Sequence, residues 1–119
     1  MARILVAEDD AAVSAFVKRA LTHRGHEVTT APDGMAALAA LAAGSFDLLL
    51  TDIVMPGLDG IALALKASKD HPRMKILLMT GFASERQRAH NLDALIHRVV
   101  EKPFNLEQIC AAVDEELEA

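Results

Sequence analysis

Short apolar runs alternate with longer segments of helical spacing along the whole chain. Five such runs predict strands, at residues 4–7, 26–31, 46–52, 75–80 and 98–101. Those at 4–7, 46–52 and 75–80 are dominated by Leu, Ile and Val, which is typical of parallel strands buried on both faces. The run at 26–31 carries polar residues and is typical of an edge strand.

The segments that follow these runs have the spacing of amphipathic helices. We expect helices at about 10–24, 35–43, 61–70 and 84–92, and from 106 onward. Asp10 and Gly25 suit the two ends of the first helix, and Asn105 with Gln108 has the form of a capping box for the last. Five strand–helix repeats predict an α/β fold, a five-stranded doubly wound parallel sheet with helices on both faces. The whole chain, 1–119, is expected to be one domain.

Side chains that could bind a ligand or take part in a reaction lie at the ends of four predicted strands. Glu8 and Asp9 follow the first strand, Asp52 ends the third, Thr80 ends the fourth and Lys102 follows the fifth. Because the carboxyl ends of parallel strands meet at one edge of a sheet, we expect these side chains to share one crevice. Such a crevice is where open α/β sheets bind their ligands.

Three carboxylates in one crevice repel one another, which favours binding of a hard divalent cation. Mg²⁺ suits Glu8, Asp9 and Asp52, with the backbone carbonyl of Val54 as a further ligand, because it needs few protein carboxylates and keeps several waters. Lys102 offers a cation and the Thr80 hydroxyl a neutral donor to phosphoryl oxygens. Asp52 is then placed to accept phosphorus as a nucleophile.

Composition narrows the class of protein. The chain has 119 residues, 52% of them hydrophobic, so it can bury a core without disulfides or metals. A net charge of −5 with scattered basic residues argues against nucleic-acid binding, and no apolar stretch is long enough for a membrane span. Cys110 is the single cysteine and is expected in the core. We therefore expect a cytoplasmic protein that binds neither nucleic acid nor membrane.

The order and spacing of these residues resemble the receiver domain of two-component response regulators, which has a flavodoxin-like (βα)5, CheY-like fold. The resemblance covers the whole chain and rests on motifs at 8–9, 52, 55–60, 80–81 and 102–104. It implies that Asp52 is the phosphoacceptor, that Glu8 and Asp9 hold Mg²⁺ with Asp9 as direct ligand, and that Thr80 and Lys102 bind the phosphoryl oxygens. It also implies a cis Lys102–Pro103 peptide bond.

The same resemblance implies partners. A histidine kinase or histidine phosphotransfer protein would donate the phosphoryl group, and an effector protein would bind the face between Ser84 and Glu116. Residues 48–56 and 79–83 are similar to the stand-alone receivers of the CpdR type, which implies a link to protease machinery. The chain departs from the family at Val99, where the best-known receivers carry Tyr or Phe. No enzymatic activity is expected beyond phosphorylation and dephosphorylation of Asp52 itself.

Other interpretations compete with this one. The chain could be an adaptor that binds its partner regardless of phosphate. A hydrolase of the haloacid dehalogenase kind would need an acid two positions after Asp52, where Val54 stands. Simpler structural roles are expected elsewhere: Asp10 and Asp59 as helix caps, and the five histidines on the surface. Phe82 suits either the core or an exposed anchor for a partner.

Overall fold

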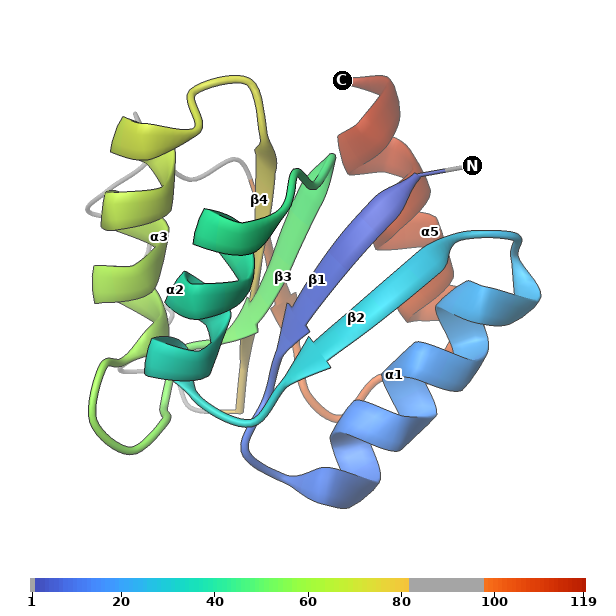
Figure 1. Ribbon diagram of the computed structural model, residues 1–119. Coiled ribbons are helices and arrows are strands. Elements are labelled where there is room, and N and C mark those ends of the chain that lie inside the picture. Colours follow the sequence, from blue (N-terminus) through green and yellow to red (C-terminus); the bar gives the residue numbers. More distant parts are fainter. Residues whose placement is uncertain (1, 82–97) are drawn as a thin grey trace.

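A five-stranded parallel sheet forms the centre of the molecule. The computed structural model describes residues 2–81 and 98–119. The strands lie in the order β2-β1-β3-β4-β5, and all neighbours are parallel (Figure 1). Their bounds are β1 Arg3–Ala7, β2 Glu27–Ala31, β3 Leu48–Asp52, β4 Lys75–Thr80 and β5 Arg98–Glu101. The predicted sheet is confirmed, with β2 at an edge as its polar residues indicate.

Helices cover both faces of this sheet. Their bounds are α1 Ala11–His23, α2 Gly34–Ala43, α3 Gly60–Asp70 and α5 Leu106–Glu118. The first and last of these pack together on one face, while α2 and α3 pack together on the other (Figure 1). The helix predicted at 84–92, and Phe82 before it, lie outside the described residues. None of the helices in the described ranges is long and apolar enough to cross a membrane.

Alternate residues of the central strands enter two separate core layers. On β1, Leu5 and Ala7 belong to the layer under α2 and α3, whereas Ile4 and Val6 belong to the layer under α1 and α5. All four are fully buried. Burial on both faces explains why the central strands are almost continuously apolar.

A carboxylate or amide side chain caps the N-terminus of each described helix. Asp10, Asp33 and Asp59 each accept hydrogen bonds from backbone amides of the first turn that follows. Asn105 and Gln108 form the reciprocal capping box at the start of α5, with both bonds 2.8 Å long. The capping functions predicted for Asp10, Asp59 and Asn105 are confirmed.

Tertiary contacts change one surface assignment made from the sequence. The side chain of His26 is only 10% exposed; its Nδ1 accepts the amide of Ala2, and its Nε2 lies 3.6 Å from Asp114. The surface position predicted for His26 is therefore wrong. Cys110 is fully buried as predicted, whereas Leu106 at the start of α5 is 41% exposed.

The close approach of α3 to the end of β3 depends on a glycine. A Cβ atom at Gly60 would overlap the backbone carbonyl of Asp52. The Gly60 amide donates to the carbonyl of Ile53 at 2.8 Å, and Gly57 provides a φ of 76° within the same loop. The loop is thereby held directly against the residue that the sequence singles out.

Replacing Gly60 with alanine should destabilise the fold, because the added methyl meets backbone atoms that cannot rotate away. We expect Gly60→Ala to lower the free energy of unfolding by about 3 kcal/mol or more. Gly44→Ala is the matched control, since its added Cβ would lie no closer than 3.8 Å to any atom considered. Urea denaturation should show the control within about 0.5 kcal/mol of the parent chain. Equal stability of the two variants would contradict the packing described here.

Candidate functional site

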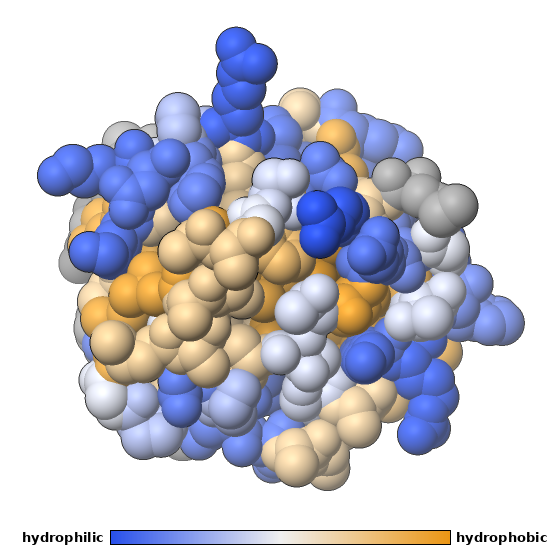
Figure 2. Space-filling model, viewed as in Figure 1, coloured by the Kyte–Doolittle hydropathy of each residue, from blue (hydrophilic) through white to orange (hydrophobic). Residues whose placement is uncertain are grey.

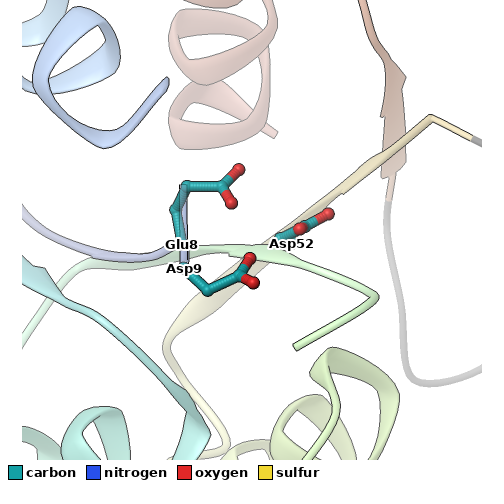
Figure 3. Close-up of side chains that lie close together, drawn as sticks. All are labelled: Glu8, Asp9 and Asp52. Atoms are coloured by element: carbon teal, nitrogen blue, oxygen red, sulfur yellow. The ribbon is translucent and has the colours of Figure 1, made fainter. Parts of the chain in front are cut away.

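Three carboxylates from two neighbouring strands meet at the carboxyl edge of the sheet. Glu8 and Asp9 follow β1, and Asp52 is the last residue of β3. One oxygen from each lies within 4.8 Å of the others, and Figure 3 shows the three side chains grouped around one space. The strand register brings them together, since Ala7 pairs with Thr51, the residue just before Asp52. The cluster predicted from the strand ends is therefore present.

Lys102 completes this cluster from the end of β5. Its Nζ lies 2.7 Å from Oε1 of Glu8 and 3.3 Å from Oδ1 of Asp52. The backbone amide of Lys102 donates to the carbonyl of Thr80 at 2.7 Å, which ties the end of β5 to the end of β4. The peptide bond between Lys102 and Pro103 is cis, as the family resemblance implies.

Glu8 is held on both sides of its carboxylate. The side chain has no exposed surface; Oε1 contacts Lys102, and Oε2 accepts the backbone amide of Asp10 at 3.1 Å. Asp9 is exposed, and the side chain of Asp52 is 10% exposed. The carboxylates open to an incoming ion are therefore those of Asp9 and Asp52, with Glu8 behind them. The contact with the Asp10 amide could not be predicted from spacing, because it depends on the turn into α1.

Burial and neighbouring charges shift the protonation of the enclosed groups. Loss of solvent raises the pKa of Asp52, and contact with Lys102 offsets only part of this effect. Burial likewise raises the pKa of Glu8, and the negative charge of Asp52 adds to it. For Lys102, burial disfavours the ammonium, but the contacts with Glu8 and Asp52 outweigh it and raise the pKa. The lysine therefore stays protonated and the site is short of positive charge.

The remaining predicted residues lie at this same edge. Thr80 is the last residue of β4 and is 2% exposed, and Val54 lies in the loop after β3 and is 46% exposed. That Thr80 donates to phosphoryl oxygens and that the Val54 carbonyl binds a metal stay predictions. Gly60 belongs to the motif at residues 55–60. Its close packing against the backbone of Asp52 explains why a glycine occupies this position.

The donor set fits a hard divalent cation. Three carboxylates face only one ammonium within this cluster, which leaves a net charge of −2 that one divalent cation would compensate, and all available donors are oxygens. The small number of protein oxygens favours Mg²⁺ over Ca²⁺, which takes six to eight oxygen ligands, many of them from the protein. Asp9 and Asp52 would hold the ion directly, because both oxygens of Glu8 already have partners.

Sequence comparison places this arrangement among known proteins. Residues 4–114 match the response regulator receiver domain family. The response regulator receiver protein CpdR of Brucella abortus is 40% identical over 98% of both chains. The transcriptional regulatory protein TcrA of Mycobacterium tuberculosis is 35% identical over 92% of this chain, which spans 43% of that protein.

Structural comparison agrees with the sequence match. A CheY-like receiver domain protein from Methanospirillum hungatei JF-1 is 34% identical with a TM-score of 0.90, and 98% of this chain and 93% of that one are covered. TrrA of Thermotoga maritima, solved with Mg²⁺ and beryllofluoride, is 32% identical with a TM-score of 0.87, and 97% and 98% are covered. Both likenesses extend over the strand ends described above.

Removing the charge of Asp52 should stabilise the metal-free fold. Because burial raises the pKa of Asp52 above its ordinary value of 3.8, the folded state binds that proton more tightly than the unfolded state. Stability therefore falls as the pH rises from 3.8 through the folded-state pKa. In EDTA at pH 7, Asp52→Asn should raise the free energy of unfolding by on the order of 1 kcal/mol, because a poorly solvated charge is removed while Lys102 keeps Glu8 as its partner.

Urea titrations at several pH values measure this difference. The advantage of Asp52→Asn should shrink as the pH is lowered toward 3.8, because the parent carboxyl then becomes neutral as well. Asp9→Asn is the control, since it removes a negative charge from an exposed position of the same cluster and should change stability less. A lower stability of Asp52→Asn than of the parent chain at pH 7 would contradict the electrostatics described here.

Proposed function

This chain belongs to the response regulator receiver domain family of two-component systems, and on that premise we propose that Asp52 accepts a phosphoryl group in a Mg²⁺-dependent reaction. The observation that carries the proposal is the contact of one lysine, Lys102, with both Glu8 and Asp52 inside an acidic pocket. A site built only for stability would not bring two like charges together out of water. A phosphoryl-transfer site needs a nucleophilic oxygen, a metal-binding acid and a cation around one reaction centre.

The proposed reaction transfers a phosphoryl group from a histidine nitrogen to a carboxylate oxygen of Asp52. An oxygen of Asp52 forms a bond to phosphorus while the phosphorus–nitrogen bond of a phosphohistidine donor breaks, and the leaving imidazole takes up a proton from solvent. Bound Mg²⁺, held by Asp9 and Asp52, would neutralise part of the charge that the phosphoryl oxygens bring. The donor would be a histidine kinase or a histidine phosphotransfer protein. The chain would catalyse only its own phosphorylation and dephosphorylation.

Lys102 and Thr80 would respond to the new charge. The ammonium of Lys102 already lies 3.3 Å from Asp52, so phosphoryl oxygens on that carboxylate would compete with Glu8 for it. The Thr80 hydroxyl would donate to another of these oxygens, and the Val54 carbonyl would complete the metal site. Since Lys102 and Thr80 share a backbone hydrogen bond, a shift in either would move the ends of β4 and β5 together.

The output would be a changed affinity for a partner protein. We place the effector surface between Ser84 and Glu116, of which the structure describes residues 98–116 with β5 and most of α5. Val99 stands where other receivers carry an aromatic ring and packs against the core layer of α2 and α3, so the switch here would work without that ring. As the specific form of this proposal, the chain would be a cytoplasmic regulator that acts on protease machinery, as its resemblance to receivers of the CpdR type implies; the 40% identity to CpdR supports that resemblance.

Phosphorylation should depend on Asp52. With acetyl phosphate and Mg²⁺, the parent chain should gain one phosphoryl group, seen by intact-mass spectrometry, whereas Asp52→Asn should gain none because an amide oxygen is a poor nucleophile. Asp70→Asn is the matched control, since it removes an exposed acid at the end of α3 and should leave labelling unchanged. Undiminished labelling of Asp52→Asn would overturn the proposal.

A phosphoryl mimic should change the protein beyond the site. Adding beryllofluoride and Mg²⁺ should shift the amide resonances of β4, β5 and the start of α5, because Lys102 links these elements to Asp52. Two-dimensional ¹⁵N NMR measures this, with Asp52→Ala as the control that should not respond. Shifts confined to the residues around Asp9 and Asp52 would instead favour the phosphate-independent adaptor.

A further inference from the structure

Helix α2 is apolar on every side although it lies at the surface. Its ten residues, Gly34–Ala43, include no polar side chain, whereas a surface helix ordinarily presents polar residues to water. Ala37 and Leu41 are buried against the sheet, but Met35 is 63% exposed, and Ala39 and Ala42 are exposed as well. Figure 2, viewed as in Figure 1, shows a continuous hydrophobic surface over this helix.

The neighbouring helix α3 borders this apolar surface. Between α2 and α3 runs a furrow of about 180 Å³, whose lining includes the apolar Leu38, Leu41 and Ala67 and the polar Lys66, Asp70 and His71. A bulky apolar side chain from another molecule would fit this furrow and lose contact with water. We name the exposed side of α2, this furrow and the adjoining part of α3 the α2–α3 face.

Charge is distributed unevenly around the α2–α3 face. Along α3, Lys66 lines the furrow and the exposed Lys69 lies one turn further on; Asp70 and His71 line the furrow as well, so these two lysines outnumber the one acid on this side. At the other border Arg3 approaches the end of α2 at Gly44, but its charge is shared with Glu27 at 3.9 Å. The side next to α3 is therefore the positive one, in a chain whose net charge is −5.

We propose that the α2–α3 face binds an amphipathic helix of a partner protein, whose apolar stripe carries Glu or Asp on the side that meets Lys66 and Lys69. The acidic flank follows from charge complementarity with the two lysines. The apolar stripe follows from the exposed Met35 and Ala39 of α2 and from the furrow between the two helices. This surface shares no residue with the carboxylate cluster around Asp52 or with the range proposed above for the effector surface.

The size of the face favours one helix over a second copy of this chain. A stable dimer buries about 800 Å² on each partner, which is about an eighth of this chain's 6305 Å² surface. Ten helical residues span only about 15 Å, so α2 offers a contact about as long as three turns of one partner helix. A second globular copy would have to bury polar surface around the face as well.

Designed peptides test the proposal directly. The probes are two fluorescent helical peptides of about four turns, with the same leucine stripe and with either glutamates or lysines along one flank. Fluorescence anisotropy should show that the parent chain binds the glutamate peptide at least about tenfold more tightly than the lysine peptide. ¹⁵N NMR should place the shifted resonances on α2 and α3. Equal binding of the two peptides, or shifts on another surface, would overturn the proposal.

Two sets of variants complete the test. Ala39→Glu places a charge on the exposed side of α2 at little cost in helix propensity, and it should weaken binding of the glutamate peptide at least about tenfold. The double variant Lys66→Glu with Lys69→Glu should reverse the preference toward the lysine peptide. Circular dichroism and acetyl phosphate labelling of Asp52 should be unchanged in all variants. Undiminished binding by Ala39→Glu would overturn the proposal, as would a dimer that this variant abolishes while neither peptide binds.

Discussion

The ammonium group of Lys102 lies between two carboxylates that would otherwise repel each other within a buried pocket. Glu8 has no exposed side-chain surface, so its ionised form depends on this contact and on the amide of Asp10. Removing one partner from such a buried ion pair commonly costs about 3–5 kcal/mol. The negative charge of Asp52 is less completely compensated than that of Glu8. Nζ of Lys102 lies 3.3 Å from Oδ1 of Asp52 but only 2.7 Å from Oε1 of Glu8. On the proposed function, this difference would let Asp52 bind a metal and accept a phosphoryl group.

The rest of the fold serves to hold these few atoms in place. Parallel pairing of β1 with β3 brings Asp9 and Asp52 to one edge, and the bond from the Lys102 amide to Thr80 fixes the lysine from the other side. Gly60 lets α3 begin directly behind Asp52. Core layers pack against both faces of the sheet. A displacement of one strand end would therefore also displace the helices packed against that strand.

Local chemistry explains which features could be predicted from the sequence. Apolar runs predict the strands, and carboxylate caps predict where helices begin. Because parallel strands end at one edge of a sheet, the sequence also predicts that four side chains lie together there: Glu8, Asp9, Asp52 and Lys102. Other features depend on contacts between distant segments. The burial of His26 results from Ala2 and Asp114, and the holding of Glu8 from both sides depends on a turn and on a lysine 94 residues away. Periodicity carries no information about such contacts.

The most direct test of the central claim is to identify the residue that carries the phosphoryl group. Borohydride reduces an aspartyl phosphate to homoserine, so the chain is phosphorylated with acetyl phosphate and Mg²⁺, treated with borohydride, digested and sequenced by mass spectrometry. The account predicts homoserine at position 52 and unmodified Glu8 and Asp9. Reduction at either of those acids with Asp52 intact, or a phosphoryl group found on a histidine, would contradict it.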